Sequence, residues 1–151
     1  MCASICPKPV GGIAAVAVVP AGAAACGSPA DIVSAAEDIP LIEDCSSYDE
    51  IVDSRDGIMR VEHQLTIAVP SGYARAHLDE GTLRRWAAAG TFATVCTQSG
   101  ERLAVGWSER FGGRQPLRLT GIEWSTDKSA HATPAAILTF RSTDCAPSIR
   151  I

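Results

Sequence analysis

The sequence predicts an α+β fold that is mainly β: an antiparallel β-sandwich or partly closed barrel with one flanking α-helix at about residues 76–89. Two patterns lead to this prediction. Apolar and polar residues alternate from Ile58 to Val69, which is the period of a strand with one buried face. Short strand-like segments separated by glycine, proline and polar turns surround a single helical pattern. With 151 residues, of which 46% are hydrophobic, the chain is long enough for one domain, 1–151, with its own core.

The first apolar run, residues 11–26, has two interpretations. It predicts a strand from Ile13 to Val19 that ends at Pro20, with residues 1–10 as an arm. Alternatively, it is a lipoprotein signal peptide that is cut before Cys26, with Lys8 as the only basic residue of its leader. We favour the strand. The run is too short for a membrane span, and Pro20 interrupts it.

Residues 20–40 are rich in alanine, glycine, proline and serine, and they predict an arm or loop with a short helical turn near Asp31–Ala36. A short edge strand is expected at Ile39–Ile42. An acidic tract overlaps this segment and runs beyond it. Its members are Glu37, Asp38, Glu43, Asp44, Asp49, Glu50 and Asp53. Calcium loops place their oxygen ligands at alternate positions around a glycine, and this tract does not, so a solvated surface is expected rather than a metal site.

The strand from Tyr48 to Arg55 should pair with Ile58–Val69 through the turn at Asp56–Gly57, because this dipeptide tolerates the positive φ of a tight hairpin. The face of the long strand expected to be buried carries Met59, Val61, His63, Leu65, Ile67 and Val69. The opposite face carries Arg60, Glu62, Gln64, Thr66 and Ala68. A polar face of this kind suits contact between the subunits of a ring, and it equally suits a sheet exposed to water.

The predicted helix spans residues 76–89, with Asp79 and Glu80 near its positive end and Gly90 at its C-terminal cap. One of its faces should pack on the sheet. That face carries Leu78, Thr82, Leu83, Trp86, Ala87 and Gly90.

The remainder of the chain predicts strands and turns. Residues 92–97 and 101–107 should form a hairpin around a turn at 98–100, and a loop is expected at 111–114. The next strand, Leu117–Trp124, has Leu117, Leu119 and Gly121 on one face and Ile122 and Trp124 on the other. The last, Ala135–Arg141, places Ala136, Leu138 and Phe140 on one face.

No sequence pattern assigns a catalytic, cofactor-binding or metal-binding residue, and we do not expect an enzyme. The histidines are His63, His77 and His131, and no metal-binding spacing joins them. His63 falls on the apolar face of its strand, which favours a hydrogen-bonded core or interface residue. A pair of Cys96 with His63 is conceivable, because strands bring distant residues together, but nothing in the local sequence supports it.

Charge and cysteine content argue against two further classes of protein, nucleic-acid binders and disulfide-stabilised folds. The formal net charge is −4 and there are two lysines, which argues against a sequence-specific nucleic-acid binder. The six cysteines are Cys2, Cys6, Cys26, Cys45, Cys96 and Cys145. They are scattered and form no CxxC pair, so we expect free thiols, with Cys96 buried in a strand.

Four segments together resemble virion structural proteins of tailed phages of gut Bacteroidetes, especially small tail-tube-like or tail-completion subunits. They are CPKPVGGIAAVAVVPA (6–21), GIMRVEHQLTIAV (57–69), the helix end RRWAAAG (84–90), and TFATVCTQSGERLAVGWSERFGGRQPLRLTGIEWSTD (91–127) followed by TPAAILTFRS (133–142). The resemblance covers most of the chain outside residues 21–45.

The resemblance implies a tail-tube fold that closes into hexameric rings, which stack through long loops and the N-terminal arm. It implies a virion protein that is made in the bacterial host cytoplasm, whose partners are copies of itself and other virion proteins, and which has no cofactor and no membrane association. Residues 20–40 and 43–57 would become ordered on assembly. An acidic lumen would let DNA slide, since phosphate binding needs positive charge. Two alternatives stay open: a cell-envelope lipoprotein or surface β-sandwich anchored at Cys26, and a small ligand-binding or enzymatic β-barrel.

Overall fold

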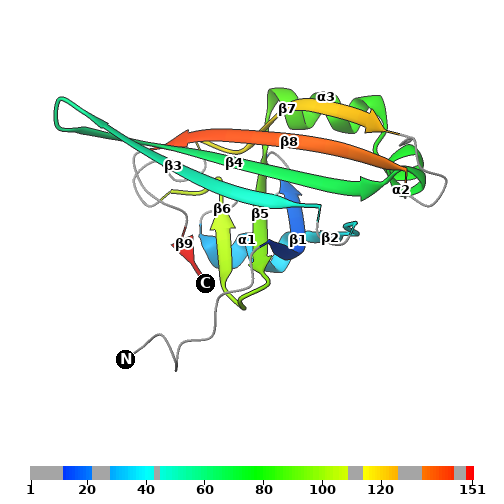
Figure 1. Cartoon of the computed structure of the whole chain (residues 1–151), viewed down its shortest axis with the longest axis horizontal. Helices are drawn as coiled ribbons and strands as arrows, with labels where there is room; N and C mark the ends of the chain where they lie inside the picture. Colours follow the sequence, from blue (N-terminus) through cyan, green and yellow to red (C-terminus); the bar gives the residue numbers. More distant parts are fainter. Residues whose placement is uncertain (1–11, 22–27, 43–44, 109–113, 126–133, 145–148) are drawn as a thin grey trace.

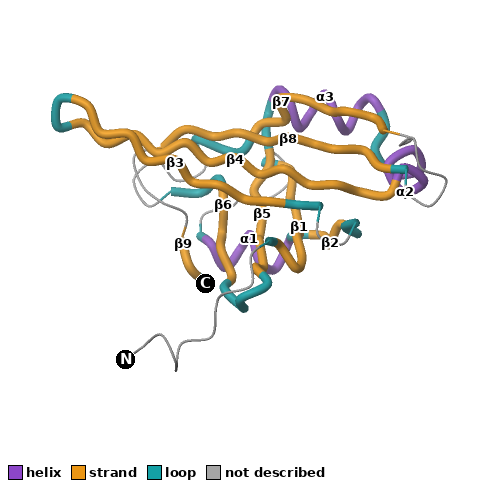
Figure 2. Tube along the Cα trace, viewed as in Figure 1, coloured by secondary structure: helices purple, strands orange, loops and turns teal. Residues whose placement is uncertain are grey.

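The computed structural model describes residues 12–21, 28–42, 45–108, 114–125, 134–144 and 149–151. In these residues two antiparallel sheets pack against each other, as Figures 1 and 2 show. Sheet A has the strand order β2-β1-β5-β6-β9, and sheet B has the order β3-β4-β8-β7. The fold is therefore mainly β and a sandwich, as predicted, and within the described residues the two sheets do not close into a barrel.

Sheet A consists of β1 (Ile13–Pro20), β2 (Glu37–Ile39), β5 (Thr91–Thr97), β6 (Arg102–Val105) and β9 (Ile149–Arg150). The predicted first strand and the predicted hairpin of β5 and β6 are present. The edge strand expected at Ile39–Ile42 lies earlier, at Glu37–Ile39, where Ile39 pairs with Val16 of β1. The two-residue β9 was not predicted.

Sheet B consists of β3 (Ser47–Arg55), β4 (Ile58–Pro70), β7 (Arg118–Ser125) and β8 (Ala135–Asp144). β4 is the long central strand that the sequence pattern predicts, and it pairs with β3 on one side and β8 on the other. The main core lies between the sheets. Its largest fully buried members include Leu65, Ile67, Leu138 and Phe140 from sheet B and Val16 and Val95 from sheet A.

A β-bulge corrects the predicted faces of β7. The pairing of β7 with β8 shifts register between Leu119 and Gly121, so Thr120 is the extra residue. As a result Leu119 and Ile122 both pack against the core, although strict alternation places them on opposite faces. Gly121 is exposed.

The helix predicted at about residues 76–89 is present as α3 (Glu80–Ala88), but it begins later than predicted, and a separate helix, α2 (Ser71–His77), precedes it. The chain leaves helical geometry at Leu78 and at Asp79, which has ψ 170°. The Asp79 carboxylate accepts a hydrogen bond from the Thr82 amide over 2.7 Å, and this N-cap starts a new helix. Trp86 of α3 then packs on Phe140, with ring centroids 5.7 Å apart. Ala87, predicted on the packed face, is exposed.

A third helix, α1 (Pro29–Ala35), lies within the segment predicted as arm or loop, where a helical turn was expected near Asp31–Ala36. Ser28 caps it, and Pro29 occupies the first turn, where the lack of an amide hydrogen costs nothing. Ile32 of α1 forms a small second core with Val19 and Phe92, on the face of sheet A that points away from sheet B. Sheet A is therefore covered on both faces.

One corner ties the two sheets together. Thr91 and Leu117 exchange two backbone hydrogen bonds of 2.7 and 2.9 Å, which join the start of β5 to the chain just before β7. Gly90 precedes this bridge with a φ of +88°. A Cβ at this position would lie 2.7 Å from Pro116 Cγ and 2.8 Å from the Leu117 carbonyl oxygen, so the corner requires glycine.

Candidate functional site

The most distinctive surface is the end of the β3–β4 hairpin. The two strands pair without interruption over nine residue pairs, from Ser47–Thr66 to Arg55–Ile58. The turn is Asp56–Gly57, with φ values of +53° and +75°, as a tight primed hairpin turn requires. The hairpin extends well beyond the body of the sandwich, as Figure 1 shows. From here on, the arm means residues 49–60, all of which are exposed, and not the N-terminal segments expected as arms.

The arm exposes large apolar side chains. Ile51 and Val52 are 54% and 56% exposed, and Ile58 and Met59 are 72% and 45% exposed. Among the described residues, seven large hydrophobic side chains are exposed, and four of them lie on the arm. Single exposed hydrophobic residues are normal, whereas several gathered on one projection mark an interaction surface.

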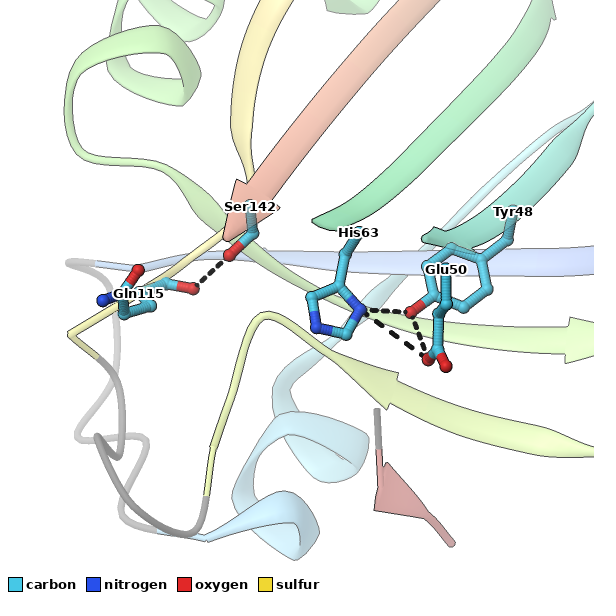
Figure 3. A network of polar contacts seen from close by, with 5 residues as sticks. All are labelled: Tyr48, Glu50, His63, Gln115 and Ser142. Atoms are coloured by element: carbon cyan, nitrogen blue, oxygen red, sulfur yellow. Dashed lines mark hydrogen bonds and ion pairs between the residues drawn. The ribbon is translucent and has the colours of Figure 1, made fainter. Parts of the chain in front are cut away.

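A polar network lies where the arm meets the core. His63 is buried, with 4% exposure, and its Nδ1 lies 2.7 Å from the Tyr48 hydroxyl and 3.7 Å from Glu50 Oε1. The Tyr48 hydroxyl donates its proton to Glu50 Oε1 over 2.7 Å, so it accepts from His63, which requires the proton on Nδ1. Figure 3 shows these contacts. The network satisfies a polar side chain at the edge of an apolar core.

This arrangement does not assemble a nucleophile with a base. Ser142 is the cross-strand neighbour of His63 in β8, but its hydroxyl donates to the Gln115 carbonyl oxygen over 2.8 Å (Figure 3). Cys96 lies in the other sheet, on β5, and is half-buried in a hollow beside α1. The conceivable pair of Cys96 with His63 is therefore wrong. His63 is the hydrogen-bonded boundary residue that the sequence pattern favours.

The remaining candidates lie apart from this network. His77 ends α2, where it stacks on Tyr73 with ring centroids 4.5 Å apart. His131 lies outside the described residues, as do Cys2, Cys6, Cys26, Cys145 and most of the loop predicted at 111–114. Cys45 and Cys96 are free thiols. Within the described ranges, no three or more His, Cys, Asp or Glu side chains form a group that could hold a metal ion.

The acidic tract is mostly strand. Asp49, Glu50 and Asp53 belong to β3, and Glu37 and Asp38 belong to β2, while Glu43 and Asp44 lie outside the described residues. Residues 47–55 are thus paired along β3 in the single chain, whereas the resemblance implies that 43–57 become ordered on assembly. The length of the arm beyond the core is the feature that sequence reasoning missed. The sequence did contain a signal for it. Asp53, Ser54 and Arg55 pair with Arg60, Met59 and Ile58, and such polar side chains do not form a buried face.

In the part of the chain that the structure describes, no helix has the length and apolar character needed to span a membrane. Comparison with protein-family models, with curated proteins and with solved structures finds no match to this chain.

Proposed function

We propose that this chain is a structural subunit that assembles through its arm, and that its class is a tail-tube-like or tail-completion protein of a phage virion. The observation that carries the proposal is the arm, a hairpin that projects from the sandwich with four exposed large apolar side chains. A structural subunit acts through such contacts and needs no reactive group.

The energetics favour burial of the arm by a partner. Each of its large apolar side chains is about half or more exposed in the single chain. Covering one of them contributes about 1 kcal/mol, since burying such a side chain completely is worth about 1.5–3 kcal/mol. An isolated two-stranded hairpin is also marginally stable in water, so contact with a neighbour would stabilise the arm itself.

Two further features support the virion class. The four segments quoted above resemble small tail subunits, and they include the hairpin strand GIMRVEHQLTIAV. The net charge of −4 suits a lumen through which DNA slides without binding. In this proposal the partners are further copies of the chain, arranged as hexameric rings, and other virion proteins.

The test is the native mass of the full-length protein, measured by light scattering over a range of concentrations. We expect a multimer whose population rises with concentration and which electron microscopy shows as rings or stacks. The double variant Ile51→Thr/Val52→Thr should weaken assembly, since it removes apolar surface but keeps the β-branched residues that strands prefer. Val33→Thr on α1, where Val33 is 37% exposed, is the matched control and should assemble like the wild type.

Two outcomes would contradict the proposal. The first is a monomer at every concentration, both alone and with other virion proteins. The second is cleavage before Cys26 in a bacterial host, seen by intact-mass spectrometry, which would favour the envelope lipoprotein instead.

A further inference from the structure

A hollow lies between the edge strand β2 of sheet A and the helices α2 and α3. Its volume is about 240 Å³, which is smaller than the usual pocket for a drug-sized ligand. Val18 and Leu78, two buried members of the main core, belong to its lining, so part of its wall is apolar. We call it the β2 hollow. Its size restricts an occupant to a small molecule.

Two large aromatic side chains, Tyr73 and Trp86, belong to the same lining. Tyr73 of α2 is half-buried and stacks on His77 with ring centroids 4.5 Å apart, and Trp86 of α3 is 5% exposed. The faces of aromatic rings carry partial negative charge, and they attract a cation that lies within about 6 Å. The aromatic part of the lining therefore favours a positively charged occupant over a negatively charged one.

Two carboxylates lie at the rim of the hollow. Glu37 and Asp38 of β2 belong to the lining, and both are exposed. Among the described residues neither forms an ion pair, and none of the described lining residues is a lysine or an arginine. Arg85 reaches the rim, where it donates to Thr82 Oγ1 over 3.4 Å, but it is not part of the lining. A cation in the hollow would therefore complement the charge around it.

An organic cation suits these groups better than a metal ion does. His77 also lines the hollow, yet in the part of the chain that the structure describes, Glu37, Asp38 and His77 do not form a group that could hold a metal. A metal ion needs several ligand atoms directly around it. An ammonium group does not, because a carboxylate on one side and an aromatic face on another already attract it.

The indole nitrogen of Trp86 adds a hydrogen-bond donor to the wall. Trp86 Nε1 is buried, and no described residue accepts a hydrogen bond from it. Buried donors in proteins are nearly always paired, so an unpaired donor in the wall of a hollow points to a partner that binds there. A hydroxyl oxygen is an acceptor that a small amine can carry. The donor and the two acids together therefore indicate an amino alcohol.

We propose that the β2 hollow binds a small amino alcohol, with its ammonium group beside Glu37 and Tyr73 and its hydroxyl group toward Trp86 Nε1. The two carboxylates disfavour a phosphate, so the ligand is the free amino alcohol and not the phosphorylated form found in lipid headgroups. The site is separate from the arm, no residue of which belongs to the described lining, so binding does not depend on self-assembly.

The test measures the affinity of the full-length protein for choline and three related probes by isothermal titration calorimetry. The first is the neutral analogue of choline, in which carbon replaces nitrogen. It should bind about tenfold more weakly than choline, since the rings and carboxylates attract only a cation. Tetramethylammonium, which lacks the hydroxyl, should bind more weakly than choline. Phosphocholine should do so as well, because its phosphate meets the two carboxylates.

Variants locate the binding site. Glu37→Gln removes a charge but keeps the size of the side chain, and it should weaken choline binding about threefold while leaving the neutral analogue unaffected. Tyr73→Leu should also weaken choline binding about threefold, whereas Tyr73→Phe keeps the ring and should bind choline like the wild type. Glu62→Gln is the matched control, because it makes the same change toward the opposite end of β4 from α2, outside the lining. Circular dichroism checks that every variant is folded.

Four outcomes would overturn the inference. Absence of choline binding would contradict it outright. Equal affinity for choline and its neutral analogue would make the hollow an apolar site without preference for charge. Equal affinity for choline and tetramethylammonium would refute the contact with Trp86 Nε1. Unchanged choline affinity in both Glu37→Gln and Tyr73→Leu would place the binding elsewhere on the protein. Each of these results would leave the proposed self-assembly standing.

Discussion

The two ends of β4 belong to one strand, yet they lie in opposite environments. From Val61 to Val69 the inward side chains are buried, and Leu65 and Ile67 are at most 1% exposed. At the turn end, Ile58 and Met59 are 72% and 45% exposed. Met59 and Leu65 share a face by strand alternation, and the difference is that sheet A lies opposite Leu65 and not opposite Met59. A strand pattern therefore reports which face is apolar, and the length of the neighbouring sheet decides where that face is covered.

The largest expected effect tests the difference between the two ends of β4 directly. Leu65→Ala should lower the free energy of unfolding by about 2–5 kcal/mol, because it leaves a cavity in a packed core. Met59→Ala, on the same face of the same strand, should change it by less than about 0.5 kcal/mol in the monomer. Urea denaturation at low protein concentration measures both. Equal losses would mean that the arm is packed within its own chain.

The next effect concerns the boundary between the two ends. Tyr48→Phe removes the hydroxyl that contacts His63 and Glu50, and it should cost about 1–3 kcal/mol, since it deprives a buried polar side chain of a partner. Tyr73→Phe is the matched control, because the contact shown by Tyr73 is the stacking of its ring on His77, and the phenyl ring keeps this contact. Chemical denaturation of both variants checks the difference. Equal losses of unfolding free energy in Tyr48→Phe and Tyr73→Phe would contradict a stabilising role for the network.

A smaller effect sharpens the description of the arm. Gly57→Ala should destabilise the hairpin by about 1 kcal/mol, because the φ of +75° is unfavourable for a residue with a Cβ. Gly72→Ala in α2 meets no atom within 4 Å and should be neutral or slightly stabilising, since alanine favours helices. Thermal unfolding with both variants measures the contrast, and a neutral Gly57→Ala would contradict the tight turn.

The smallest expected effect concerns the N-cap of α3, which lies outside the β3–β4 hairpin and gives a reference for the effects measured there. The Thr82 backbone amide, which donates to the Asp79 carboxylate, holds the pKa of that carboxyl below its ordinary 3.8. A lowered folded-state pKa gives a stabilisation that is present above the unfolded pKa and lost as the pH falls through the folded pKa. Asp79→Asn keeps a cap but cannot titrate. Its difference from the wild type in urea midpoint should therefore be largest near neutral pH and vanish in acid. A difference that does not change with pH would refute the assignment.

The sequence predicts which helices and strands form better than it predicts where they begin, break or bulge. Alternation in β4 and the Asp56–Gly57 turn are local signals, and the structure has both. The break between α2 and α3 also has a local signal, because Asp79 is a preferred N-cap residue, but the apolar spacing across Leu78 and Trp86 favoured one helix. The bulge at Thr120 depends on its pairing with β8, which no window of the sequence contains.

The candidate surfaces were harder to predict. The arm consists of residues whose types fit a half-buried hairpin, and only the end of sheet A leaves them uncovered. A hollow beside β7 and β8 is lined by Arg114 and Arg118 together with Arg141, residues from two segments that are adjacent only in the folded sheet. Charge totals cannot reveal it, because the whole chain is acidic.

Because α1 covers the outer face of sheet A, the two sheets should differ in how well their outer faces tolerate substitutions. On β5, Phe92 and Thr94 are buried although they point away from sheet B, so replacing them disturbs packing under α1. On sheet B the corresponding outward positions, such as Gln64 and Thr66, are only half-buried, so changing them should affect folding less. Variation can therefore accumulate on the outer face of sheet B, where Asp49, Arg118 and Arg141 also lie, while the opposite side of the molecule stays constrained by its packing. The exposed face of sheet B can therefore change in charge and shape while the core stays the same.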